Sequence, residues 1–168
     1  MTRLRTLLIG LAALTLTACA SVQRLDAAAD VHALLIAIRD NDTATFDAHI
    51  DRRALKQQLQ QRLDVEVART PELRGLAAVF GPSVVNIAGD ALLQPGVFKL
   101  VAAHYGYTPQ TRIPSQVEIA AALKPLPDGR VCAVSKKNGP CLLIFTKEQG
   151  AWKLSGFEGD ASMLRLKL

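Results

Sequence analysis

The chain of 168 residues is poor in the residue patterns from which catalytic and metal sites are usually built. Its three histidines include no pair spaced four residues apart, so the helical spacing of a common zinc site is missing. No Gly-x-Ser-x-Gly elbow and no phosphate-binding loop occurs, and the three cysteines include no Cys-x-x-Cys pair. We therefore expect no metal, no cofactor and no enzymatic activity.

Signals for nucleic-acid binding are also missing. The basic residues are spread along the chain and do not alternate with aromatic residues, of which there are few. Without Arg3 and Arg5, the twenty basic residues fall to eighteen against fifteen acidic ones, a net charge of +3. Such a mild excess affects solubility and attraction to anionic surfaces. We expect no nucleic-acid partner.

The first eighteen residues have the layout of a secretory leader. Arg3 and Arg5 precede an uncharged apolar run over residues 7–16, and small residues follow it. The run is too short to span a bilayer as a helix, and no later apolar run approaches that length without interruption. Removal of residues 1–18 leaves 168 − 18 = 150 residues, enough for one domain with its own core.

The end of this leader, Leu16-Thr17-Ala18-Cys19, resembles the lipobox of bacterial lipoproteins. The resemblance implies cleavage before Cys19, attachment of a diacylglycerol to its thiol and acylation of its new amino group. Ala20, where an aspartate would favour inner-membrane retention, implies transfer to the outer membrane with the domain facing the periplasm. The alternative is an ordinary secretory leader cut nearby, with Cys19 as an unmodified residue.

Cys132 and Cys141 form an even pair, which in an oxidising compartment favours a disulfide. They flank a turn segment, so they belong to neighbouring strands of one hairpin. If the loop centres on residues 136–137, the two cysteines face each other. If residues 138–139 form a two-residue turn, the register shifts and Cys132 pairs near Phe145.

Apolar periodicity predicts helices in the first two-thirds of the chain. Residues 19–29 are interpreted as a lipidated tether and residues 30–168 as a single domain. The first helix follows Asp30, with an earlier start at Val22 or Leu25 as the alternative. Later helices are expected after Asp42, after Asp51, over residues 71–80 and over residues 97–105. In the helix expected after Asp51, an apolar residue recurs every four positions, and these residues are expected to be buried: Leu55, Leu59, Leu63 and Val67.

After Pro114 the pattern becomes extended. Residues 116–123, 130–135, 141–147 and 151–157 are short runs separated by turn residues, and residues 164–168 form a candidate fifth strand. Helices followed by hairpin-connected strands predict an α+β domain, with N-terminal helices packed on an antiparallel β-meander.

The segments 37–42 and 49–55, continued by Leu59 and Leu63, resemble the start of the bacterial domain-of-unknown-function family 2939, and residues 90–96 are similar to its proline-gated segment. This resemblance implies a fold and no activity. The order of elements, ending in the segment 150–157, also resembles a cone-shaped domain of the nuclear-transport-factor-two type. That likeness implies a pocket between sheet and helices.

Two groups of residues are candidates for a site. One group is Asp47, His49 and Asp51, which would share a face on a strand. On the helix expected here, they are interpreted as a solvated helix end and a capping aspartate. The aromatic candidates for a pocket lining or a partner surface are Phe80, Phe98, Tyr105, Tyr107, Phe145 and Trp152.

The leading hypothesis is a non-enzymatic outer-membrane lipoprotein whose periplasmic domain binds another envelope component. The alternative is a carrier or sensor of a small apolar ligand held between helices and sheet. A weaker third hypothesis is a hydrolase that uses pocket carboxylates.

Overall fold

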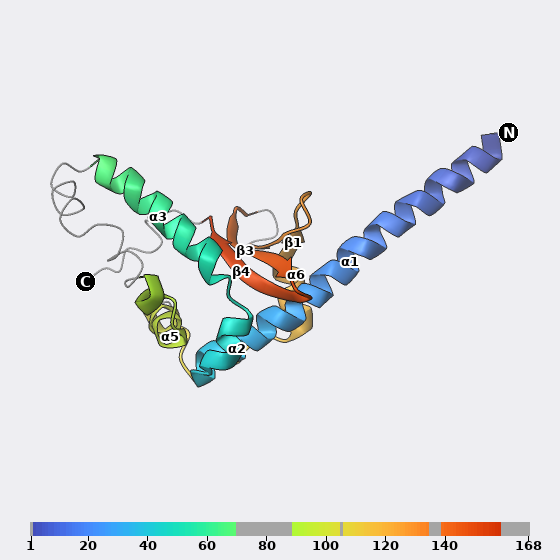
Figure 1. The fold of residues 1–168 in the computed structure, drawn as a ribbon. Coiled ribbons are helices and arrows are strands. Elements are labelled where there is room, and N and C mark those ends of the chain that lie inside the picture. The colour runs from blue at the N-terminus through green and yellow to red at the C-terminus, as the bar shows by residue number, and fades with distance from the viewer. Residues whose placement is uncertain (1, 70–88, 105, 135–138, 159–168) are drawn as a thin grey trace.

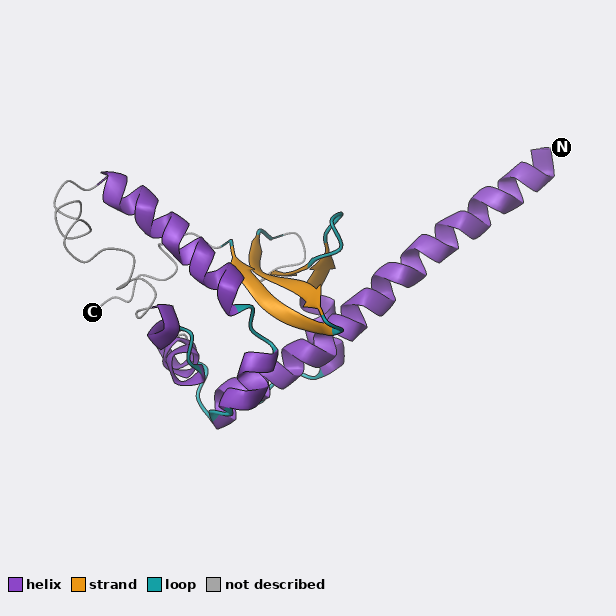
Figure 2. Cartoon of the chain, viewed as in Figure 1, coloured by secondary structure: helices purple, strands orange, loops and turns teal. Residues whose placement is uncertain are grey.

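The computed structural model describes residues 2–69, 89–104, 106–134 and 139–158, with side chains described from residue 20 onward. The helices are α1 (Thr2–Asp40), α2 (Thr43–Ala48), α3 (Arg52–Arg69), α5 (Pro95–His104) and α6 (Gln116–Ala122). The strands are β1 (Leu123–Pro125), β2 (Val131–Val134), β3 (Cys141–Glu148) and β4 (Ala151–Phe157). The fold is α+β, with the helices first and the strands last, as predicted (Figure 2).

The four strands form an antiparallel meander in the order β1-β2-β3-β4. The sheet lies in the angle between α1 and α3, and both helices contact β4 (Figure 1). The segment after α2 runs beside β4, where the Asp51 amide donates to the Leu154 carbonyl and the Leu154 amide donates to the His49 carbonyl, both at 2.9 Å. This short parallel bridge covers part of the strand edge that would otherwise be open to another chain.

Alternate residues of β4 point into the core, as expected for a half-buried strand. Trp152 and Leu154 are buried there, together with Phe145 of β3. Phe46 of α2 is fully buried and meets the ring of Phe98 edge to face, with 5.2 Å between ring centroids. The core therefore joins the sheet to α1 and α2 through one apolar cluster.

The predicted leucine stripe of α3 is correct only near the start of the helix. Leu55 is buried, Leu59 and Val67 are half-buried, and Leu63 is 39% exposed. The reason is tertiary: α3 contacts the sheet at β4 and then extends past it (Figure 1). Gln58 fixes this contact, because its side chain both donates to the Phe157 carbonyl and accepts from the Phe157 amide.

The strand predicted over residues 116–123 is wrong, because residues 116–122 form α6. Ser115 caps this helix and makes a capping box with Glu118, whose carboxylate accepts from the Ser115 amide at 2.7 Å. This serine–glutamate spacing and the three alanines that follow favour a helix over a strand. The first strand of the meander is the short β1, which begins directly after α6. The candidate fifth strand over residues 164–168 and the helix predicted over residues 71–80 lie outside the described residues.

The tether predicted over residues 19–29 is helical, so the structure follows the earlier of the two helix starts. Helix α1 is continuous through this segment, and Ala27 and Ala28 are fully buried in the core. Asp26 accepts a hydrogen bond from the Trp152 indole at 2.8 Å and Asp30 accepts one from the Trp152 amide at 2.7 Å. The packed part of the domain thus begins before residue 30.

Cys132 and Cys141 are joined by a disulfide, the pairing predicted from their number and compartment. Cys132 lies opposite Ile144, one residue from the Phe145 pairing of the second predicted register. An irregularity between Ala133 and Val134 shifts the end of the hairpin, and the two cysteine Cα atoms lie 5.6 Å apart. This separation is within the range that a disulfide can bridge.

Replacing both cysteines by alanine is expected to lower the free energy of unfolding by about 2–3 kcal/mol, because the disulfide closes a loop with a sequence separation of nine. Urea denaturation followed by circular dichroism measures this change. Wild-type protein unfolded in the presence of a reductant is the control and should lose the same amount. An unchanged midpoint under reducing conditions would contradict the prediction.

Candidate functional site

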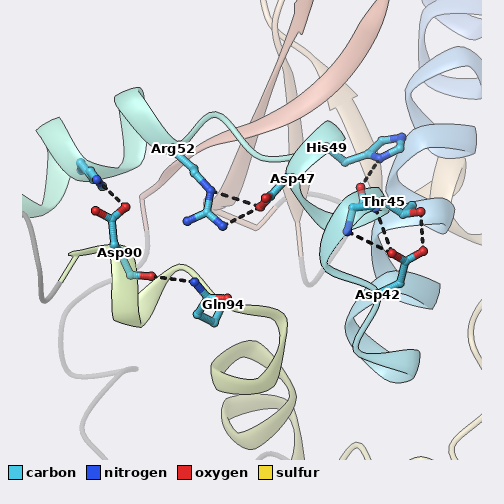
Figure 3. A network of polar contacts seen from close by, with 9 residues as sticks. Asp42, Thr45, Asp47, His49, Arg52, Asp90 and Gln94 are labelled. Atoms are coloured by element: carbon cyan, nitrogen blue, oxygen red, sulfur yellow. Dashed lines mark hydrogen bonds and ion pairs between the residues drawn. The ribbon is translucent and has the colours of Figure 1, made fainter.

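Asp47, His49 and Asp51 each bond to a different partner near the junction of α2 and α3, as Figure 3 shows for Asp47 and His49. Asp47 pairs with Arg52, while His49 Nδ1 lies 2.8 Å from the Thr45 carbonyl oxygen. Asp51 accepts from the Ala54 amide at 2.9 Å and so caps α3, as predicted. Within the described part of the chain, no group of three acidic, histidine or cysteine side chains is placed to hold a metal ion.

The same region is tied together by further caps and ion pairs. Asp42 caps α2 by accepting from the amides of Ala44 and Thr45, and the Thr45 hydroxyl donates to it at 2.6 Å (Figure 3). The hydroxyl of Thr45 is the main reason that the pKa of Asp42 lies below its usual value. Lys56 of α3 pairs with Asp90, which positions the chain ahead of α5. These contacts stabilise the helix junctions.

Three of the four aromatic candidates within the described residues pack in or against the core. Phe145 and Trp152 are buried in the core, and Phe98 packs between Phe46 and Phe157. These three side chains belong to the apolar cluster between the helices and the sheet. Tyr107 is 62% exposed, and Phe80 and Tyr105 lie outside the described residues.

A surface pocket lies elsewhere, between the C-terminal half of α1, α5 and the 107–114 loop; we call it the α1–α5 pocket. Its volume of about 330 Å³ is near the lower end of the range for ligand sites. The walls are mainly apolar and include Leu35 and Ile38 of α1 and Ala102 of α5. Tyr107, Ile113 and Pro114 complete the wall on the loop side. The pocket is therefore suited to an apolar group that enters from solvent.

Cationic side chains from both helices stand at this pocket. Arg39 bonds in a bidentate manner to Asp40, at 2.7 and 2.9 Å. The Lys99 ammonium donates to the Arg39 carbonyl at the end of α1, at 2.9 Å. The guanidinium of Arg39 is the main reason that the pKa of Asp40 is lowered, and Lys99 lowers it further. Because Asp40 neutralises the charge of Arg39, the Lys99 ammonium adds a further positive charge at the edge of the pocket.

Ion pairing and capping fix one end of the 107–114 loop. Both guanidinium amino groups of Arg112 donate to Glu118 at the start of α6, at 2.9 and 2.6 Å. Arg112 first, and Ser115 second, hold the pKa of the Glu118 carboxyl well below its usual range. At the other end of the loop, the amide of Thr108 donates to the Thr111 hydroxyl. These bonds restrict the conformation of the loop side of the pocket.

Sequence reasoning found Tyr107 and missed the rest of the α1–α5 pocket. Leu35 and Ile38 of α1 are only half-buried, because they form part of the pocket wall. The Ser115 and Glu118 capping box was an available signal that the loop ends at a helix. No local signal indicates that Lys99 meets the end of α1, since sixty residues separate it from Arg39.

Cys19, the predicted site of lipid attachment, lies within α1, and its side chain is outside the described part of the structure. Helix α1 extends from the rest of the domain at its N-terminal end (Figure 1). Within the described residues, no helix combines the length and the hydropathy that a membrane crossing requires.

A family model described as a protein of unknown function, DUF2939, matches residues 9–100. The match includes most of α1, all of α2 and α3, and the start of α5; it ends before the 107–114 loop and the sheet. No curated protein and no solved structure matches the chain. Since the matched segment is more than half of the 168 residues, the chain belongs to the DUF2939 family.

Proposed function

We propose that the protein is a non-enzymatic lipoprotein, anchored to the outer membrane through Cys19, whose periplasmic domain binds another envelope component. The α1–α5 pocket is the proposed binding site. The lipobox-like segment Leu16-Thr17-Ala18-Cys19 supports the anchor, and the Cys132–Cys141 disulfide supports an oxidising compartment such as the periplasm.

The observation that carries the binding proposal is the α1–α5 pocket itself. Its apolar wall opens to solvent, and exposed Tyr107 stands in it. Tyrosine is well suited to a contact surface because it offers a large apolar ring and a hydroxyl together. The Lys99 ammonium at the pocket favours a partner that presents an acidic group beside its apolar group.

A small apolar ligand is the second candidate for the same pocket. The volume of about 330 Å³ admits one slender molecule, and the apolar walls favour a hydrocarbon group. Native mass spectrometry of residues 20–168 separates the two candidates. A stoichiometric extra mass that is lost on denaturation favours the ligand, whereas a bare monomer favours a macromolecular partner.

Photocrosslinking in intact cells tests the partner-binding proposal. We expect a photoreactive phenylalanine analogue at position 107 to give a discrete crosslinked product. The Ala102→Trp substitution should abolish this product, because the larger side chain fills the pocket from α5. Immunoblotting of the crosslinked envelope fraction measures both results.

Two controls accompany the crosslinking. Leu100→Trp introduces the same side chain on α5 at an exposed position outside the pocket lining, and it should leave the product intact. A photoreactive residue at Leu63, an exposed position of α3, should not give the same product. Equal products from positions 107 and 63, or a product that persists in Ala102→Trp, would contradict binding at the α1–α5 pocket.

A further inference from the structure

The turns of α1 that follow Cys19 pack directly against the sheet, close to the predicted anchor. The Gln23 side chain donates to the Gly129 carbonyl in the β1–β2 turn, at 2.8 Å. The Asp26 carboxylate accepts hydrogen bonds from the Trp152 indole at 2.8 Å and from the Lys147 ammonium at 2.6 Å. These two bonds, with Lys147 first, hold the pKa of Asp26 below its usual value, so its carboxylate is a stable acceptor for both donors.

This packing leaves no flexible spacer after Cys19. Seven residues of α1 separate Cys19 from Asp26, which at 1.5 Å per residue is about 10 Å. An extended tether over residues 19–29 would instead reach about 36–40 Å. A lipid on Cys19 would therefore hold the domain against the bilayer surface and not at a distance from it.

The same turns of α1 carry a small apolar face that the domain does not cover. Val22 is 66% exposed and Leu25 is 51% exposed, and Ala29 is exposed as well. The spacing of three and then four residues places them on one side of the helix. Gln23 and Ala27, four residues apart, lie on the other side, toward the sheet and the core. The apolar face is therefore exposed to solvent beside the sheet-contacting side of α1, with Asp26 at the border between the two sides.

Polar groups border this face, as in helices that lie along a membrane surface. Asp26, one turn from both Val22 and Ala29, accepts from the Lys147 ammonium at 2.6 Å at the edge of the face. A long lysine side chain of this kind can keep its charge in the headgroup layer while its stem covers apolar surface. The position next to the anchor, the exposed apolar residues and the flanking cation together fit a lipid surface.

We infer that the Val22–Leu25–Ala29 face of α1 lies in the headgroup region of the membrane that holds Cys19, so that the domain rests on the bilayer in a fixed orientation. This inference depends on the proposed lipid anchor. The α1–α5 pocket begins at Leu35, sixteen residues along α1 from Cys19, or about 24 Å. The anchored end and the binding end of the domain are thus separated along one rigid helix.

Spin labels on the full-length, processed protein test the inference. The single substitutions Val22→Cys and Leu25→Cys each add one reactive thiol. The other thiols do not react, because the Cys19 thiol carries the diacylglycerol in the proposed form and Cys132 is bonded to Cys141. The labelled proteins are reconstituted in vesicles of phosphatidylethanolamine and phosphatidylglycerol. Collision rates with molecular oxygen, which concentrates in the bilayer, and with a water-soluble nickel chelate report the depth of each label.

We expect labels at positions 22 and 25 to favour oxygen over nickel severalfold relative to Leu100→Cys, an exposed position on α5. Mass spectrometry of the N-terminal peptide is run on the same samples. Lipidated protein with equal nickel access at all three positions would overturn the surface contact and leave the anchor intact. An N-terminus without lipid would overturn both the anchor and the contact.

Discussion

The Cys19→Ala variant is expected to accumulate as an uncleaved precursor without lipid. If the lipobox-like segment is functional, the diacylglycerol has to be attached to the Cys19 thiol before cleavage, and alanine has no thiol to modify. The N-terminal peptide should then retain residues 1–18, and no lipid-modified peptide should be found. Mass spectrometry of that peptide, together with fractionation of the envelope, measures the result.

The double variant Cys132→Ala/Cys141→Ala is the matched control for this experiment. It removes the other two cysteines of the chain and leaves the lipobox-like segment intact, so cleavage and lipidation should be unchanged. Its reduced stability is expected and is measured separately. Normal cleavage and membrane retention of Cys19→Ala would contradict the lipoprotein interpretation and favour an ordinary secretory leader.

The Phe46→Ala variant is expected to lose about 3–5 kcal/mol of unfolding free energy. Phe46 is fully buried in the core, and its ring meets that of Phe98 edge to face. Truncation would remove this contact and leave a cavity where α2 packs against the rest of the core. Urea denaturation of the soluble domain measures the loss through the shift of the midpoint.

Leu63→Ala is the control for Phe46→Ala and should change the unfolding free energy by less than about 0.5 kcal/mol. Both substitutions remove an apolar side chain from a helix, but Leu63 is 39% exposed whereas Phe46 is fully buried. A large loss for Leu63→Ala would show that the far half of α3 is covered. A loss below about 1 kcal/mol for Phe46→Ala would contradict its place in the core.

The sequence predicted the helix junctions well because short-range chemistry decides them. Asp42 and Asp51 cap α2 and α3 through amides two or three residues away. Asn41 and Gly106 take positive φ angles of 58° and 85° next to the ends of α1 and α5. The turn at residues 149–150 joins β3 to β4 in the same way. Each of these caps and turns depends only on residues that are close together in the sequence.

The secondary-structure predictions were wrong where a local pattern is compatible with two structures, or where contacts with a distant segment decide the structure. Residues 116–122 alternate in a way that suited a strand, but the Ser115 and Glu118 capping box favours a helix. Residues 20–29 are small and polar enough for a tether, and they are helical because the sheet offers Trp152 and Lys147 as partners for Asp26. Those partners are more than 120 residues away, beyond any local pattern.

The sequence by itself determined the α+β class, the caps of α2 and α3 and the candidate disulfide, because each depends on periodicity, on neighbouring residues or on the count of cysteines. Only the tertiary structure decided the α1–α5 pocket and the direct packing of α1 against the sheet. The pocket requires the 107–114 loop and Lys99 to meet the end of α1, more than fifty residues away in the chain. Such contacts depend on how helices pack, and packing is set by the whole core at once.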